Sequence, residues 1–162
     1  MKATQVSKFN GSTVVLAVSL ELSKGSWKIA LHDGCREKAA LHTVSSPMAA
    51  QRLSQAAQVI EETKRKWGLG HDVPVVVVYE AGQDGFWIQR ALSALGYEVL
   101  VIDPASLPVE RRARRAKTDR LDAIKLVLAL RAWLRGEHDR MHVIHVPTEA
   151  SEAQRQLTRE RG

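Results

Sequence analysis

The chain has little of what would tie it to an oxidising compartment or to a membrane. Cys35 is the single cysteine among 162 residues, so no disulfide can form within the chain and a reducing compartment is expected. No apolar run approaches the roughly 18 residues that a membrane-spanning helix needs, and the N-terminus has no apolar signal core. We therefore expect a cytoplasmic protein that has no membrane partner.

The sequence also lacks the patterns of two kinds of ligand site, structural zinc sites and glycine-rich phosphate-binding loops. His142 and His145 have no other ligands at the spacing of a structural zinc site. Gly82 and Gly85 match neither the dinucleotide-binding pattern nor the P-loop, and we interpret them as a turn that leads into a helix. Structural zinc and these two phosphate-binding loops are therefore not expected.

What the chain does have is an ordinary globular composition, with 44% hydrophobic and 26% charged residues, enough for one domain with a proper core. The 24 Lys and Arg residues exceed the 18 Asp and Glu residues, and the net charge of +6 favours an anionic partner such as nucleic acid. Six of the ten residues at 111–120 are basic, so this segment is the predicted nucleic-acid contact. Its basic residues are Arg111, Arg112, Arg114, Arg115, Lys117 and Arg120.

Hydrophobic periodicity predicts an α/β fold with a mixed five-stranded sheet flanked by helices. Strands are expected at 14–22, 26–31, 39–44, 74–79 and 97–102, and a short extended segment at 142–147. Helices are expected at 47–67, at 86–95 and from about Thr118 to Leu134. Pro47 is predicted in the first turn of its helix, with Ser45 and Ser46 as caps.

Four carboxylates are expected to meet at one end of this sheet. Glu21 lies in the first apolar strand, where a charge is costly unless it is solvated, paired or bound to a metal. Glu80 follows the most hydrophobic strand, where ligand-facing residues gather. Asp119 and Asp122 are predicted to share one face of the helix that begins near Thr118. Because clustered carboxylates repel one another, this pattern favours a site for Mg²⁺ or Mn²⁺, which can clamp the oxygens of a phosphodiester.

Each of these features also has a simpler interpretation. Glu21 could be an exposed strand residue, and Glu80 could form a salt bridge with a nearby arginine. Asp119 could be an acidic residue near a helix N-terminus, favoured by the helix dipole. The basic segment at 111–120 could be a solvated helix face or a loop.

Three segments carry a resemblance to a known family, namely LELSKGSWKIAL, YEAGQDGFWIQRALSALGYEVLVIDP and RRAKTDRLDAIKL. They resemble the N-terminal domain of the DEDD-type insertion-sequence transposases, over about residues 14–161. The resemblance implies a RuvC-like, RNase H-like fold and four acidic residues that act in catalysis and hold Mg²⁺ or Mn²⁺. Carried over position by position, these residues are Glu21, Glu80, Asp119 and Asp122.

The resemblance also implies partners. The family comprises DNA recombinases that are guided by a structured noncoding RNA and whose paired subunits form composite active sites. DNA, a guide RNA and a homo-oligomer of the full-length protein are therefore expected, with a nucleoid-associated location in the bacterial cytoplasm. By this resemblance the chain is a metal-binding domain that acts in DNA cleavage and strand exchange.

Two departures from the family bear on this expectation. Glu21 stands where the family usually has Asp, which moves the carboxylate by roughly 1.5 Å, about one carbon-carbon bond. The family's serine nucleophile lies in a C-terminal domain beyond a helical arm, and no serine of this chain is expected to replace it. We therefore expect a flexible N-terminus at 1–12, a RuvC-like DEDD domain at 13–140, and a linker with the start of a truncated helical arm at 141–162.

Two other classes of function stay open. A nucleic-acid-binding module without catalysis would use the carboxylates only to stabilise the fold or to orient arginines. An ATP-binding phosphotransferase of the actin and sugar-kinase type shares the strand order. That class needs glycine-rich phosphate loops after the first strand, where this chain has only Gly25, so it ranks last.

Overall fold

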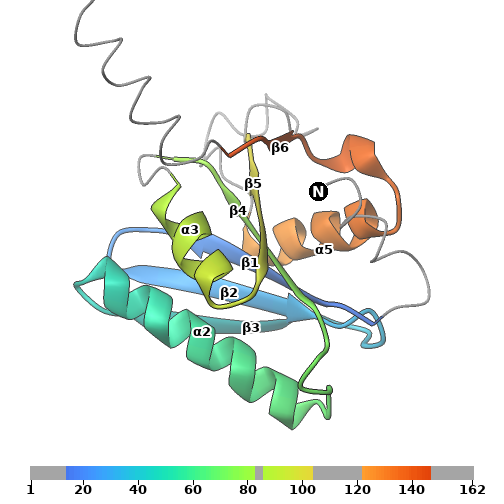
Figure 1. Cartoon of the computed structure of the whole chain (residues 1–162), viewed down its shortest axis with the longest axis horizontal. Helices are drawn as coiled ribbons and strands as arrows, with labels where there is room; N and C mark the ends of the chain where they lie inside the picture. Colours follow the sequence, from blue (N-terminus) through green and yellow to red (C-terminus); the bar gives the residue numbers. More distant parts are fainter. Residues whose placement is uncertain (1–13, 83–85, 104–121, 147–162) are drawn as a thin grey trace, which may run out of the picture.

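A computed structural model describes residues 14–82, 86–103 and 122–146. Within these ranges the chain forms a mixed sheet with helices on both faces, as in the RNase H-like fold (Figure 1). The six strands of this sheet follow the order β3-β2-β1-β4-β5-β6. The predicted fold class is confirmed.

The first half of the sheet is an antiparallel meander and the second half is parallel. The meander consists of β1 (Leu16–Leu22), β2 (Ser26–His32) and β3 (Ala40–Ser45). On its other side β1 pairs in parallel with β4 (Val75–Glu80), which pairs in parallel with β5 (Glu98–Ile102). The five strands predicted from hydrophobic periodicity therefore all form, with ends that differ by one or two residues.

Helices occupy the connections between the parallel strands, because a parallel pair needs a crossover. The helix α2 (Ala49–Lys66) leads into β4, and α3 (Trp87–Ala94) lies between β4 and β5. The helix α5 (Ala123–Leu134), the short 3-10 helix η2 (His138–Arg140) and β6 (Val143–Ile144) follow. The predicted extended segment at 142–147 is confirmed by β6, which pairs antiparallel with β5.

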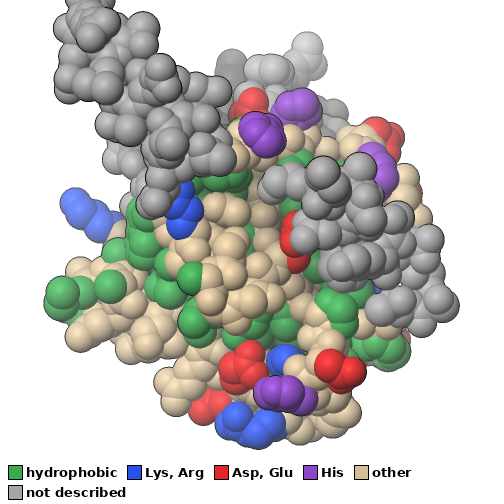
Figure 2. Space-filling model, viewed as in Figure 1, with side chains coloured by type: hydrophobic (Ala, Val, Ile, Leu, Met, Phe, Trp, Pro, Cys, Tyr) green, Lys and Arg blue, Asp and Glu red, His purple; other side chains and the backbone are tan. Residues whose placement is uncertain are grey.

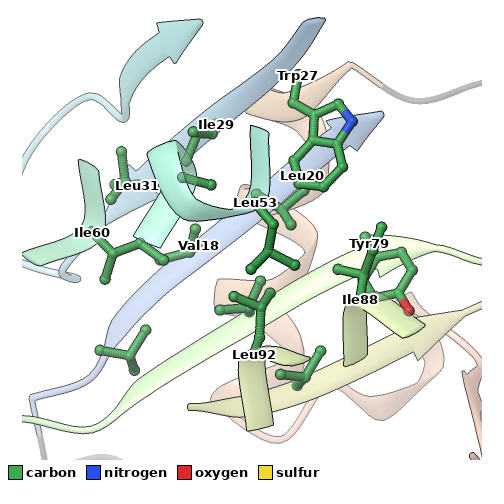
Figure 3. Packing of buried hydrophobic residues seen from close by; sticks show 14 of the residues in the cluster. Val18, Leu20, Trp27, Ile29, Leu31, Leu53, Ile60, Tyr79, Ile88 and Leu92 are labelled. Atoms are coloured by element: carbon green, nitrogen blue, oxygen red, sulfur yellow. The ribbon is translucent and has the colours of Figure 1, made fainter. Parts of the chain in front are cut away.

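Side-chain alternation along the strands divides the core into two layers. Val18, Leu20, Val77 and Tyr79 point to the face that α2 and α3 cover, and Figure 3 shows Ile60, Ile88 and Leu92 packed in that layer. Ala17, Val76 and Val78 point to the other face and pack against Leu126 and Leu130 of α5. The central strands are therefore buried on both faces, as the continuous β-branched run of β4 predicts.

Helix α2 begins two residues later than its sequence predicts. Met48 is the N-cap residue and has an extended backbone, so Pro47 precedes the helix rather than occupying its first turn. The Ser46 hydroxyl accepts a hydrogen bond from the Met48 N–H and donates one to Gln51, and no side chain caps the helix directly. Ser46 therefore orders the chain before the helix.

The prediction that Asp122 lies inside a helix that begins near Thr118 is wrong. Asp122 has φ −73° and ψ 166°, an extended conformation, and α5 begins at the next residue, Ala123. The reason is local, because the Asp122 carboxylate accepts a hydrogen bond from the Lys125 N–H at 2.8 Å and caps the helix. Asp119 and Asp122 consequently cannot share one face of this helix.

Several predictions concern residues outside the described ranges. They include the flexible N-terminus at 1–12, the basic segment at 111–120 with Asp119, and the helical arm expected in the last part of 141–162. The sheet itself continues past residue 140, since β6 pairs with β5 and Met141 is buried in the second core layer. None of the helices in the described ranges has both the length and the apolar character that crossing a membrane requires.

Candidate functional site

Two carboxylates stand at the ends of neighbouring parallel strands. Glu21 follows Leu20 in β1, Glu80 follows Tyr79 in β4, and Leu20 and Tyr79 are partners in the register of the two strands. Successive side chains of a strand point to opposite faces of the sheet, so every second residue points to the same face. In β1, Glu21 therefore points to the same face as Ala17, which packs in the layer under α5. In β4, Glu80 likewise points to the same face as Val76 and Val78, which pack in that layer. The predicted convergence of Glu21 and Glu80 on one sheet end is therefore present in the strand register.

Both glutamates are only partly exposed. The residues before them in β1 and β4 are buried, and Glu21 and Glu80 themselves lie where the sheet meets solvent. The Oε2 atom of Glu80 is shielded from solvent. Carboxylate groups in this position can bind a ligand at the end of the strands while the rest of each side chain remains packed.

The N-terminus of α5 lies at the same end of the sheet. Two side chains of β1 bind its first residue, since Ser19 Oγ donates to the Ala123 carbonyl at 2.6 Å and Glu21 Oε1 accepts from the Ala123 N–H at 3.2 Å. Ser19 is fully buried. These two bonds join segments more than a hundred residues apart and hold Asp122, the residue before Ala123, beside the end of β1.

The length of the Glu21 side chain suits this contact. An aspartate at this position would be shorter by one carbon-carbon bond, about 1.5 Å. The 3.2 Å bond to the Ala123 N–H would then be lost unless the backbone moved. The length of Glu21 thus fits its hydrogen bond to the first residue of α5.

The structure brings together some of the predicted site residues. Glu21, Glu80 and Asp122 lie at one end of the sheet, whereas Asp119 and the basic segment at 111–120 are outside the described ranges. In the part of the chain that is described, no three His, Cys, Asp or Glu side chains form a cluster able to hold a metal ion. The carboxylates of the described ranges therefore do not form such a cluster by themselves.

Sequence reasoning missed Ser19 as a residue that shapes the site. A signal was present, since Ser19 is a polar residue in an apolar strand and has the same parity as Glu21. Its partner could not be identified, because Ala123 is 104 residues away in the sequence. Asp103, which follows β5 at the same sheet end, was also not singled out, and its N–H donates to the His142 carbonyl at 3.2 Å.

Charges of both signs are interspersed on the described surface. Figure 2 shows acidic, basic and histidine side chains side by side at the end of the molecule where α2 terminates. The described ranges contain 13 Lys and Arg residues and 12 Asp and Glu residues, close to neutrality. The positive excess of the chain therefore belongs to the remaining segments, above all to 104–121.

The family model and the relatives that this chain resembles all carry the description of a transposase. The family model described as Transposase, for DEDD transposases of the IS110 type, matches residues 32–162. The y4rJ protein of Sinorhizobium fredii, which carries the name of a transposase, is 43% identical over 145 residues, 89% of this chain and 36% of that protein. The transposase for insertion sequence element IS1533 of Leptospira borgpetersenii is 33% identical over 79 residues, 49% of this chain and 21% of that protein.

The lengths of these proteins differ strongly. The chain spans between 20% and 36% of the length of the curated relatives it matches. Among solved structures, YeaZ from Pseudomonas aeruginosa is similar with a TM-score of 0.39 and 18% sequence identity, covering 64% of this chain and 50% of that one.

Proposed function

The chain belongs to the family of DEDD transposases of the IS110 type, and from this premise we propose that it is the N-terminal metal-binding domain of an insertion-sequence transposase. Its proposed role is DNA cleavage and strand exchange through a Mg²⁺ or Mn²⁺ site. The catalytic and metal-binding residues in this proposal are Glu21, Glu80, Asp119 and Asp122. The serine nucleophile of the family would come from another part of the full-length protein.

The single observation that carries this proposal is the alignment of Glu21 and Glu80. They follow the paired residues Leu20 and Tyr79 on neighbouring parallel strands and point to one face, next to the capped N-terminus of α5. Two carboxylates side by side would repel each other, and a divalent cation between them removes that repulsion. Carboxylate oxygens are also the ligands that Mg²⁺ and Mn²⁺ prefer.

The carboxylates of the described ranges are oxygen ligands of the kind that such an ion binds, and Asp119 would be a further ligand in this proposal. Glu21 has one oxygen, Oε1, bonded to the Ala123 N–H, and Asp122 has Oδ1 bonded to the Lys125 N–H. These bonds orient both carboxylates before any ligand arrives. When bound, the metal would stabilise negative charge on the attacking and leaving oxygens of a phosphodiester.

Nucleic acid is the partner that the charge distribution favours. The described ranges are nearly neutral, so the excess of +6 resides mainly in the segment with Arg111, Arg112, Arg114, Arg115, Lys117 and Arg120. Following Lys117 and Arg120, the chain reaches the capped start of α5 at Asp122. We propose that this segment delivers DNA, and a structured guide RNA, to the acidic end of the sheet in the bacterial cytoplasm, with subunits paired in the full-length protein.

The test is a calorimetric titration of Mn²⁺ into the 162-residue chain and three variants of confirmed fold. Glu80→Gln and Asp122→Asn are expected to weaken binding at least tenfold, because each removes a ligand charge while Asn at position 122 preserves the helix cap. Glu62→Gln, at an exposed glutamate of α2, is the matched control and should bind as the wild type does. Equal binding by all four proteins would contradict the proposed metal site.

A nucleic-acid-binding module without catalysis is the second candidate. The observation in its favour is that no cluster of three potential metal ligands occurs among the described residues. This alternative predicts that the double variant Asp119→Asn, Asp122→Asn binds RNA and DNA unchanged or more tightly, and that the wild type does not bind Mn²⁺. The phosphotransferase alternative ranks last, since the β1–β2 turn is short and is closed by the Ser23 N–H donating to the Ser26 carbonyl.

A further inference from the structure

Two lysines flank the carboxylates of the proposed site. Lys28 in β2 is the register partner of Glu21 in β1, and it is exposed although its neighbours Trp27 and Ile29 are buried. Lys125 lies in the first turn of α5, is also exposed, and donates its backbone N–H to Asp122. Strand pairing therefore places Lys28 beside Glu21, and the helix cap places Lys125 beside Asp122.

Lys28 points to the same side of the sheet as the carboxylates. Alternation in β2 sends Trp27, Ile29 and Leu31 into the layer under α2 and α3, and sends Ala30 into the layer under α5. Lys28 shares the parity of Ala30 and therefore lies on the α5 face. Directly opposed residues of an antiparallel pair have Cβ atoms about 4.5–5.5 Å apart, so the Lys28 stem starts next to that of Glu21.

Neither lysine side chain is explained by a contribution to the stability of the fold. Within the described residues, neither ammonium group forms an ion pair or a hydrogen bond, although Glu21 and Asp122 are close by. A lysine in the first turn of a helix is moreover unfavourable, because the N-terminus carries the positive end of the helix dipole. Both ammonium groups remain available to an anion from solution.

We propose that Lys28 and Lys125 bind backbone phosphates of the nucleic acid at the acidic end of the sheet. The inference rests on the proposed function, since it assigns these lysines to the substrate of that same site. The carboxylates would hold the metal, and the lysines would neutralise phosphates of the bound strand. The ligand chemistry is a phosphodiester chain, read without regard to base sequence.

The experiment measures binding of a fluorescein-labelled single-stranded DNA of about 20 nucleotides by anisotropy, over a series of KCl concentrations at constant Mg²⁺. Lys28→Gln and Lys125→Gln are each expected to reduce the slope of log K against log salt by about 0.7, the value for one phosphate contact on a single strand. Lys66→Gln is the matched control, since Lys66 is exposed near the end of α2 on the opposite face. Lys28→Arg should restore the wild-type slope.

The outcomes separate this inference from the proposed function. Slopes that stay unchanged in Lys28→Gln and Lys125→Gln, or that change equally in Lys66→Gln, would overturn the assignment of the lysines. DNA binding that follows the expected slopes in a protein that does not bind Mn²⁺ would support the lysines and refute the metal site. A wild-type chain that binds no DNA would overturn the assignment of the lysines, and the Mn²⁺ titration would still decide the metal site.

Discussion

Ser19 is a polar side chain that the fold uses inside its core. It is fully buried in β1, and its hydroxyl donates to the Ala123 carbonyl at 2.6 Å. A buried hydroxyl without a partner would cost free energy, so this bond specifies where α5 can start. The residue contributes to the site through the position of its neighbours.

We predict that Ser19→Ala lowers the free energy of unfolding by about 0.5–1.5 kcal/mol, the net value of one such hydrogen bond. Urea denaturation of the wild type and the variant measures the difference. Ser54→Ala, at an exposed position of α2, should change stability by less than about 0.5 kcal/mol. An equal effect of the two substitutions would show that the bond to α5 contributes nothing.

His32 is expected to make the stability of the fold dependent on pH. Burial and then the positive charge of Arg131 lower the pKa of His32 from its ordinary value of 6.5. Its Nδ1 accepts a hydrogen bond from the Gly34 N–H at 2.9 Å, which requires that Nδ1 carry no proton. Gly34 is suited to this turn, since its φ is +86° and an added Cβ would collide with the Arg131 guanidinium.

The sign of this effect follows from proton linkage. The unfolded chain protonates His32 near pH 6.5, whereas the folded chain does so only at lower pH, so the unfolded state binds more protons in between. We predict that the free energy of unfolding falls as the pH drops below about 6.5, until the folded protein also takes up the proton. Urea denaturation between pH 5 and pH 8 should show a smaller pH dependence in His32→Gln than in the exposed control His42→Gln. Identical profiles would exclude His32 as the titrating group.

At the scale of secondary structure, the start of α5 determines the geometry of the candidate site. Asp122 caps α5, and Glu21 and Ser19 of β1 bind the first residue of this helix. The position of Asp122 therefore depends on the contact between β1 and α5. The same carboxylate that we assign to metal binding therefore also has a structural role. Substitutions must be chosen so that the two roles can be separated.

Asp122→Ala is expected to destabilise the protein by about 1 kcal/mol, because Ala cannot accept the hydrogen bond of the Lys125 N–H. Asp122→Asn should cost far less, since Asn is an equally good N-cap residue. Thermal unfolding followed by circular dichroism compares the two variants in metal-free buffer. Equal losses in both would mean that the charge of Asp122, rather than its hydrogen bond, stabilises the helix.

For the whole molecule, the notable property is a sheet that is covered on both faces. Val77 and Val78 are neighbours in β4, yet Val77 packs in the layer of α2 and α3 and Val78 packs in the layer of α5. Both side chains are fully buried. The two layers share the central strands and should therefore unfold together.

We predict that Val77→Ala and Val78→Ala each lower the free energy of unfolding by on the order of 2 kcal/mol, through lost burial and a small cavity. Each variant should still unfold in one cooperative transition when followed by circular dichroism and by tryptophan fluorescence. A negligible cost for Val78→Ala alone would show that the α5 layer contributes little to the stability of the sheet.

The sequence by itself determined most of the architecture. Alternating and continuous apolar runs predict the five strands β1 to β5, and the helical stripes predict α2 and α3, because local periodicity reflects which face is buried. The two glutamates could be assigned to one sheet end from the same periodicity, since carboxyl ends of parallel strands meet at one edge. The sequence pattern also added Asp119 and Asp122 to this set, and the family resemblance agreed with it. The structure places Asp122 next to the residue that Glu21 binds, whereas the place of Asp119 stays a prediction.

Only the tertiary structure decided how α5 meets the sheet. The helix begins at Ala123 and not near Thr118, because the Asp122 carboxylate satisfies a backbone N–H that the helix itself leaves open. The bonds of Ser19 and Glu21 to Ala123 span more than a hundred residues, and no local pattern encodes a contact at that separation. Lys28 likewise comes beside Glu21 only through the register of β1 and β2, which is set when the two strands pair over a common core.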